Sequence, residues 1–163
     1  MRARVVSNFL PNSLRVNVEQ IDQQHEALFS CLAELKEICV DTGELPDEQA
    51  EMLLSTLREH CATEEQLAGE AGLDFSRHGD KHQTMLKAID KAVHELSIGK
   101  RDAFGLLRYI EYWFERHIGE EDLLLGANLQ QVCDGLFDTE QPFTLARVAT
   151  LPPHAAHSFP CHP

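Results

Sequence analysis

Apolar residues recur at intervals of three and four positions along four segments of the chain, which is the spacing of an α-helix that buries one face. With the polar residues that share these stripes, the positions are Ile21, His25, Leu28, Leu32, Leu35 and Cys39; Leu53, Leu57, His60, Glu64, Leu67 and Ala71; His78, His82, Met85, Ile89, Ala92 and Leu96; and Leu106, Ile110, Trp113, His117, Glu121 and Leu124. The pattern predicts an all-α protein with four amphipathic helices.

The links between these segments are short and contain residues that end helices. Residues 41–46 include Gly43 and Pro46, residues 72–76 begin with Gly72, and residues 98–100 include Gly99. Glycine is common just beyond a helix because it adopts the left-handed conformation without steric cost. Short links also force neighbouring helices to run in opposite directions. The sequence thus predicts an up-down-up-down antiparallel four-helix bundle over residues 20–132.

Both ends of the chain are predicted to lie outside the bundle. Residues 1–19 are expected to form an extended N-terminal arm that packs against it, since Leu14, Val16 and Val18 alternate with polar residues. Residues 133–163 are rich in proline, at Pro142, Pro152, Pro153, Pro160 and Pro163. Because proline interrupts helices, we expect an irregular C-terminal tail there.

The chain is acidic, with 27 Asp and Glu residues against 14 Lys and Arg residues and a net charge of −13. No basic cluster is available to neutralise phosphates, so neither a nucleic acid nor an anionic membrane is expected as a partner. The N-terminus lacks the apolar core of a secretory signal. Five scattered cysteines fit reduced thiols better than a disulfide framework. We therefore expect a cytoplasmic protein, as a monomer or weak oligomer.

Five histidines and one carboxylate share the helical stripes with the core leucines. They are His25, His60, Glu64, His78, His82 and His117. Burying so many polar groups without partners would be costly. A neutral imidazole binds iron, zinc or copper, and a carboxylate can bridge two metals. Ligands from four helices therefore predict a pair of transition metals in the middle of the bundle, although the spacing does not choose the metal.

The spacing in the fourth predicted helix leaves two carboxylates as candidates for the metal ligand. Glu121 follows His117 by four residues, so both would share one helix face. Asp122 follows by five residues, which is about 140° around an ideal helix. Spacing alone favours Glu121, unless a π-type turn brings Asp122 inward or its side chain reaches across.

Four short motifs resemble those of the hemerythrins. Residues 21–25, Ile-Asp-Gln-Gln-His, followed by Leu28-Phe29, resemble the opening motif of that family. Residues 60–64 resemble its His-x-x-x-Glu, residues 78–82 its His-x-x-x-His, and residues 117–122 its His-Ile-x-x-x-Asp. All four motifs occur in order over residues ~8–127, which makes the resemblance far more specific than any one of them.

The resemblance implies a non-haem di-iron site. His78, His82 and His117 would bind one iron, and His25 and His60 the other. Glu64 and Asp122 would bridge the two ions together with an oxo or hydroxo group. Glu121 would then be exposed, or would lie next to the ligands without binding metal itself. Three histidines saturate the first iron, whereas two leave the second with an open position. There, the resemblance implies, dioxygen binds as a reversible ligand.

The oxygen pocket that the resemblance implies has an unusual lining. Its residues would be Leu28, Cys61, Trp113, Phe114 and Ile118. Cys61 stands where an aromatic residue is usual, Phe114 where leucine is common, and Leu10 where a tryptophan usually precedes the first helix. Because cysteine is smaller than phenylalanine, we expect Cys61 to widen the pocket or admit water, and the site to autoxidise faster than that of a typical member.

The sequence therefore predicts reversible dioxygen binding, for oxygen transport, storage, delivery to an oxygen-using enzyme, or sensing with a signalling partner. One alternative is a di-iron enzyme with peroxidase or ferroxidase activity. It would need a proton donor near the open position, and Glu121 is the one extra carboxylate on the inward stripes. Another alternative is an iron-handling stress protein, which would release its metal readily.

Overall fold

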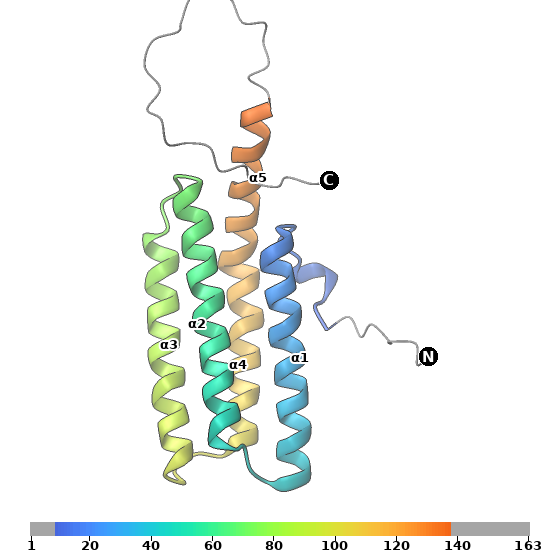
Figure 1. The fold of residues 1–163 in the computed structure, drawn as a ribbon, viewed down its shortest axis with the longest axis vertical. Coiled ribbons are helices and arrows are strands. Elements are labelled where there is room, and N and C mark those ends of the chain that lie inside the picture. The colour runs from blue at the N-terminus through green and yellow to red at the C-terminus, as the bar shows by residue number, and fades with distance from the viewer. Residues whose placement is uncertain (1–8, 138–163) are drawn as a thin grey trace, which may run out of the picture.

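The computed structural model describes residues 9–137 and has an all-α fold (Figure 1). Its elements are a 3-10 turn at Asn12–Leu14, α1 (Glu19–Thr42), α2 (Asp47–Glu70), α3 (Ser76–Ser97), α4 (Ala103–His117), a π-helical turn at Ile118–Asp122 and α5 (Leu123–Phe137). The π-helical turn joins α4 to α5, so the three segments form one long fourth helix (Figure 1). The four helices run alternately up and down. The predicted fold class is confirmed.

Local signals in the sequence set the ends of these helices. Gly43, Gly72 and Gly99 all adopt the left-handed conformation, with φ of 76°, 68° and 69°. The N–H of Gly43 donates to the carbonyl of Cys39 at 2.9 Å and closes the last turn of α1. The three glycines that the sequence marks as helix ends therefore make the turns of the bundle.

The predicted stripes form the core, with one displacement in the fourth helix. All six predicted positions of α1 are buried. Leu67, Ala71, Leu96 and Trp113 pack partly buried at the edge of the core. Leu124, predicted to be buried, is 57% exposed, and Leu125 is buried instead. The prediction was wrong because the π-helical turn contains one residue more than an α-helical turn and rotates every later position.

The N-terminal arm packs against the bundle through two buried side chains, Leu10 and Val16. Two carboxylates of α1 hold its backbone: Glu26 accepts a hydrogen bond from the N–H of Leu10 at 2.7 Å, and Asp22 accepts one from that of Val16 at 2.8 Å. The arm is not extended throughout, because Asn12–Leu14 form a 3-10 turn. The contact with the bundle agrees with the sequence-based expectation of an extended arm, which this one turn interrupts.

Gly126 of α5 lets the arm approach the fourth helix. A Cβ atom at this position would lie 2.4 Å from the carbonyl oxygen of Val16. Gly126→Ala is therefore expected to displace the arm and lower the free energy of unfolding by about 1–3 kcal/mol. Gly135→Ala is the control, since nothing lies within 4 Å of a Cβ atom placed at that position. This variant should leave the free energy of unfolding unchanged or raise it by about 0.5–1 kcal/mol. Equal unfolding curves for the two variants would contradict this contact.

α5 continues past the predicted end of the bundle. It runs to Phe137, so residues 133–137 are helical rather than part of an irregular tail. In Figure 1 its end stands above the loop that joins α2 to α3. The rest of the predicted tail, with its five prolines, and residues 1–8 of the arm lie outside the described residues. Within the described part of the chain, no helix is long and apolar enough to span a membrane.

Candidate metal centre

The structure brings all seven predicted ligand residues together inside the bundle. They are His25 from α1, His60 and Glu64 from α2, His78 and His82 from α3, His117 from α4, and Asp122 from the π-helical turn. Every one is buried. Their ligand atoms form two overlapping groups that share Glu64 and Asp122, and within each group the atoms lie within 4.8 Å of one another. The cluster is therefore arranged as two adjoining sites with two carboxylates in common.

Three imidazole nitrogens converge on one side of the cluster. The Nε2 atom of His117 lies 3.0 Å from that of His78 and 2.9 Å from that of His82. Ligands placed about 2.1 Å from a common ion, at right angles to one another, are separated by about 3.0 Å. Both separations from His117 are therefore those expected between nitrogen ligands of one metal ion.

The two carboxylates lie between this histidine group and the other one. Asp122 points its Oδ1 atom at His117, 3.0 Å away, and its Oδ2 atom at His25, 3.2 Å away. Glu64 Oε2 lies 3.2 Å from His82 Nε2 and 3.7 Å from His60 Nε2. Each carboxylate therefore faces nitrogen atoms of both histidine groups, as a ligand that bridges two ions must.

Many polar atoms of the cluster have no hydrogen-bond partner within the described chain. They are both ring nitrogens of His25, Nε2 of His60, and both carboxylate oxygens of Glu64 and of Asp122. The short separations around Asp122 lack hydrogen-bond alignment, since its oxygens remain unpaired. Each buried polar atom without a partner costs about 1–3 kcal/mol, which metal ions among these atoms would offset. The residues present fit bound metal.

The π-helical turn explains how Asp122, rather than Glu121, enters the cluster. A π-helical turn contains one residue more than an α-helical turn, so the residue five positions after His117 returns to the same helix face. Glu121 is also buried, at 5% exposure, but it points toward α3, where it accepts hydrogen bonds from Arg77 at 3.1 Å and from Lys81. The prediction from α-helical spacing, which favoured Glu121 as the ligand, was therefore wrong. Glu121 is buried and ion-paired rather than exposed.

The sequence model of the hemerythrin HHE cation-binding domain matches residues 16–129, more than half of the chain. The chain belongs to this family. Comparisons with curated proteins and with solved structures give no match. The matched region contains the whole histidine and carboxylate cluster of this hemerythrin domain, so a metal-binding function is supported by both the family and the geometry.

Burial keeps two histidines of the hemerythrin domain neutral. It is the largest cause that lowers the pKa of His60 to about 3, followed by the charge of His25. Burial, followed by the charge of His117, lowers the pKa of His82 to about 2. Both imidazoles are therefore unprotonated at physiological pH, which is the form whose lone pair binds a metal.

The two carboxylates differ in protonation when metal is absent. Burial, followed by repulsion from Asp122, raises the pKa of Glu64 well above its usual range. Burial also raises the pKa of Asp122, but its interactions with His117, His25 and His78 outweigh it and hold that pKa well below the usual range. In the metal-free cluster, the ionised form is therefore favoured at Asp122 and the protonated form at Glu64, because two like charges so close together repel each other.

These shifts predict that the metal-free hemerythrin domain loses stability in acid. Between pH 4.5 and 6.5 the unfolded chain protonates His60 and His82, whereas the folded chain does not. Glu64 acts in the opposite sense, because its raised pKa favours proton binding in the folded chain. Two histidines outweigh one carboxylate, so the unfolded state binds more protons in this range and the free energy of unfolding should fall on acidification. Urea unfolding at pH 4.5 to 6.5 measures this slope; stability that is flat or rises toward acid would contradict it.

Gln24 orients His60 and was not singled out from the sequence. Its Oε1 atom lies 3.2 Å from Nδ1 of His60, and its Nε2 donates to Thr63 Oγ1 at 2.9 Å. Since the amide nitrogen of Gln24 faces Thr63, its oxygen faces His60 and accepts from the Nδ1–H. The Nε2 lone pair of His60 is then directed at the cluster. A glutamine directly before a ligand histidine is a weak signal, so only the structure reveals this role.

Phe114 closes the side of the cluster formed by His25 and His60. Its ring centroid lies 5.3 Å from that of His25 and 5.6 Å from that of His60, edge to face in both cases. Leu28 and Ile118, also predicted as pocket lining, are fully buried. Apolar side chains therefore shield the two-histidine side from water.

Cys61 and Trp113, the other predicted lining residues, occupy different environments. Cys61 is buried, and this burial, with the charge of Glu64 next, raises the pKa of its thiol to about 12. It is therefore a small, protonated thiol. Trp113 is partly buried and stacks on His117, with ring centroids 4.5 Å apart and planes 16° apart. It lines a surface groove together with residues of α3, on the three-histidine side of the cluster.

Proposed function

We propose that this hemerythrin domain binds dioxygen reversibly at a non-haem di-iron site. One observation carries the proposal: Asp122 directs one oxygen at His117 and the other at His25, so a single carboxylate joins two unequal nitrogen groups. Three histidines on one side and two on the other support one saturated ion and one ion with an open position. The function would be oxygen transport, storage, delivery or sensing in the cytoplasm, with an oxygen-using enzyme or a signalling protein as partner.

In this proposal the chain supplies all ligands other than an oxo or hydroxo bridge. His78, His82 and His117 would hold one iron, His25 and His60 would hold the other, and Glu64 and Asp122 would be shared by both ions. When bound, the pair of ions would supply the electrons that reversible dioxygen binding requires. Gln24 fixes the orientation of one ligand, and Asp122 stays ionised even before metal binds.

The apolar wall keeps protons and water away from the open position. Phe114 packs edge-on against both histidines of that side, and Leu28 and Ile118 are inaccessible to solvent. A dry pocket slows the protonation that would release reduced oxygen and leave the metal oxidised. This exclusion of water supports reversible binding rather than turnover.

An enzymatic function is less well supported, because a proton donor is missing from the position where the sequence offered one. Burial raises the pKa of Glu121, but its hydrogen bond with Lys81 and the charges of Lys81 and Arg77 lower it overall. Glu121 is therefore ionised and ion-paired, which makes it a poor proton donor. Oxygen binding remains the function that this site supports best.

Anaerobic titration of the metal-free chain with ferrous iron tests the di-iron proposal. We expect binding to saturate at two ions per chain. Saturation at one ion would overturn the di-iron assignment, even if that ion were tightly held.

Cys61→Phe is expected to slow conversion of the oxygen-loaded chain to the oxidised diferric form. The larger phenyl ring would narrow the pocket beside the cluster and further restrict the entry of water. The measurement is the rate of diferric absorbance growth in air, compared with that of the unaltered chain. Cys61→Ser is the matched control, since it keeps the side chain small, and it should autoxidise at least as fast. Equal rates for Cys61→Phe and the unaltered chain would contradict this role.

A further inference from the structure

The ligands of the cluster differ in how close they lie to the protein surface. His78 is 8% exposed, and His82 and His117 are 4% exposed each, whereas the other four ligands are at most 2% exposed. Phe114 packs against both histidines of the opposite side and covers them. The cluster is therefore nearest to solvent on its three-histidine side.

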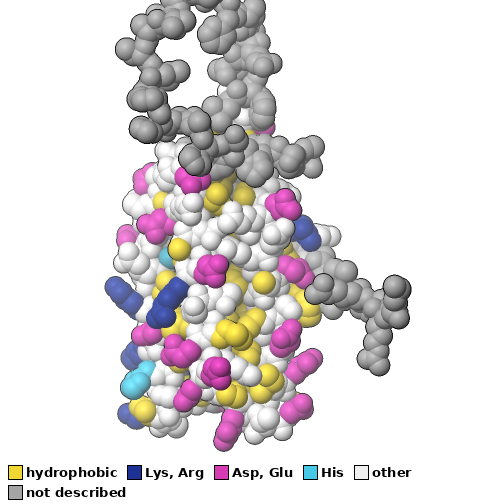
Figure 2. All heavy atoms as spheres, in the orientation of Figure 1, with side chains coloured by type: hydrophobic (Ala, Val, Ile, Leu, Met, Phe, Trp, Pro, Cys, Tyr) yellow, Lys and Arg dark blue, Asp and Glu magenta, His cyan; other side chains and the backbone are white. Residues whose placement is uncertain are grey.

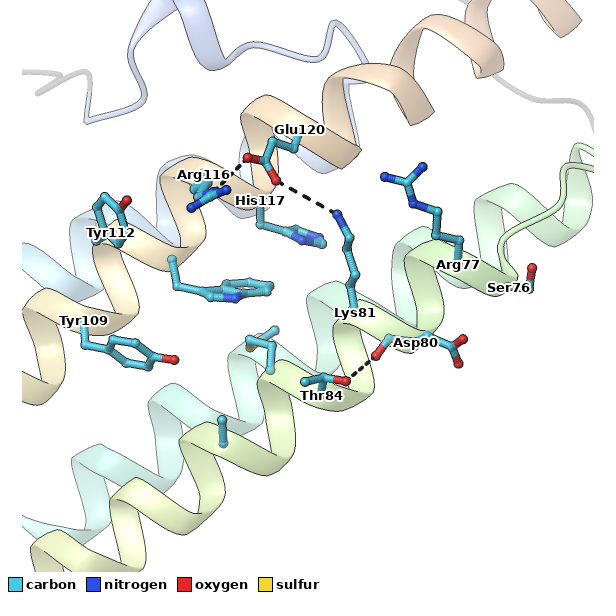
Figure 3. Close-up of a pocket in the computed structure, with 13 residues that line it drawn as sticks. Ser76, Arg77, Asp80, Lys81, Thr84, Tyr109, Tyr112, Arg116, His117 and Glu120 are labelled. Atoms are coloured by element: carbon cyan, nitrogen blue, oxygen red, sulfur yellow. Dashed lines mark hydrogen bonds and ion pairs between the residues drawn. The ribbon is translucent and has the colours of Figure 1, made fainter.

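A surface groove of about 720 Å³ between α3 and α4 reaches this side of the cluster (Figure 3). His117 is one of the residues that line it. The two helices contact each other less than α3 contacts α2 or α4 contacts α1. The groove therefore brings solvent next to a metal ligand, at the place where the helices of the bundle are least tightly joined.

Charged side chains close the groove at the level of the ligands. Lys81 reaches from α3 across the groove and lies 4.0 Å from Glu120 of the π-helical turn (Figure 3). It also donates to the buried Glu121, which accepts a second hydrogen bond from Arg77 at 3.1 Å. These four residues form one ion-pair network, the Lys81 network, that joins α3 to the fourth helix.

The Lys81 network joins the segments that carry ligands. Arg77 and Lys81 each directly precede a ligand histidine of α3, and Glu121 directly precedes Asp122. No member of the network belongs to the two ligand groups themselves. Separation of α3 from the fourth helix would thus break the network and open the three-histidine side, while every ligand remained on its helix.

The Lys81 network also places positive charge where a metal cation would pass. The chain carries a net charge of −13, which attracts cations to its surface. On the face drawn in Figure 2, acidic side chains are spread over the bundle, whereas most Lys and Arg side chains lie along the edge formed by α3. Because Lys81 crosses the groove, its ammonium group repels a divalent cation there as long as the network is closed.

We propose that metal ions enter and leave the cluster through this groove, and that the Lys81 network limits the rate of both steps. A barrier on a path slows entry and release by the same factor, so the network controls exchange of the metal without setting its equilibrium affinity. The inference rests on the cation binding of this family and on the geometry of the groove, and it is independent of the proposed oxygen chemistry.

Release and uptake of ferrous iron without air test this route. Release is measured by mixing the iron-loaded chain with excess bipyridine, and uptake by trapping the unbound iron with bipyridine at intervals after mixing. Lys81→Met removes the charge and keeps a side chain of similar length. It should speed release about tenfold, because a hydrogen bond between charged groups is lost. Uptake should speed up by a similar factor.

Three further variants separate the charge of Lys81 from its bulk. Lys91→Met is the matched control, because Lys91 is an exposed lysine of the same helix, paired with Glu95 outside the groove. It should change neither rate. Lys81→Arg keeps the charge and should release iron at close to the unaltered rate. Arg77→Gln should have a smaller effect than Lys81→Met, since the Arg77 side chain is largely exposed and its ion pair is weakened by water.

Ionic strength distinguishes an ion pair from a merely structural role of Lys81. Raising sodium chloride from about 0.01 M to about 1 M shortens the screening length from about 30 Å to about 3 Å. Release from the unaltered chain should therefore become faster with salt, and release from Lys81→Met should respond less. A release rate of the unaltered chain that does not rise with salt would overturn the role of the network, whether or not Lys81→Met folds.

The rate comparisons have two further outcomes that would overturn the proposal. One is equal rates for Lys81→Met and Lys91→Met. The other is faster release without faster uptake, which would mean that Lys81 contributes to affinity rather than to the route. Far-UV circular dichroism checks that each variant is folded. Saturation at one ferrous ion per chain would refute the proposed di-iron function, but the rate comparisons would still decide the route.

Discussion

Asp122→Asn is expected to abolish binding of the second metal ion while the chain remains folded. The two oxygens of Asp122 face His117 and His25, 3.0 and 3.2 Å away, and the carboxylate is ionised. Asparagine has almost the same shape but one oxygen and no charge, so it cannot bridge two ions. Loss of a residue that only hydrogen-bonds to a metal ligand typically lowers the affinity for the metal about 10–100-fold. Loss of a carboxylate that binds two ions should lower it further.

The matched control for this variant lies one residue away. Glu121→Gln removes a charge from the same turn, but Glu121 points toward Lys81 and Arg77 rather than into the cluster. It should retain two metal ions per chain. Metal analysis after dialysis measures both variants, and far-UV circular dichroism checks that both are folded. Loss of metal from Glu121→Gln together with retention in Asp122→Asn would show that the fourth helix has the simple α-helical register.

Phe114→Ala is expected to produce the largest loss of stability among single substitutions in the bundle. Its side chain is among the largest that are fully buried, and its ring packs against both histidines of one side and against Phe29. Replacement of a buried phenylalanine by alanine costs about 3–5 kcal/mol, through lost burial and the cavity that remains. The cavity would also open the two-histidine side to water and shorten the life of the oxygen-loaded form.

Chemical unfolding of the metal-loaded chain measures the first effect, and the rate of autoxidation in air measures the second. Tyr112→Ala, on the same helix, is the control. Tyr112 is exposed, and replacement of an exposed side chain outside the core usually changes the free energy of unfolding by about 0.5 kcal/mol or less. A loss below that of the control, or unchanged autoxidation, would contradict the assignment of Phe114 as the wall of the pocket.

Much of the fold could be predicted because the determining signals are local and periodic. The 3–4 spacing predicted six of the seven buried positions of α1, and glycines marked three helix ends. The same period placed His60 and Glu64 on one face of α2, and His78 and His82 on one face of α3. Since antiparallel helices of similar length align these positions at one depth, convergence of the cluster followed from sequence.

The sequence did not predict the point at which the fourth helix departs from the α-helical period. The π-helical turn shifts later positions by one residue, which exposes Leu124, buries Leu125 and turns Asp122 inward. Family motifs favoured Asp122, but the α-helical period contradicted it, and no residue type in the turn marks a π-helical geometry. The contact of Gln24 with His60 and the groove beside Trp113 likewise depend on how helices pack, which periodicity alone does not encode.

The visible absorption spectrum through an oxygen cycle tests the central claim most directly. The metal-free chain is loaded with ferrous iron without air, exposed to oxygen, and then freed of oxygen. Reversible binding predicts a charge-transfer band that appears with oxygen and disappears on its removal, with the ferrous spectrum restored over repeated cycles. A band that decays to a permanent diferric spectrum while oxygen is consumed would contradict reversible binding and would favour an oxidising enzyme or an iron-handling protein.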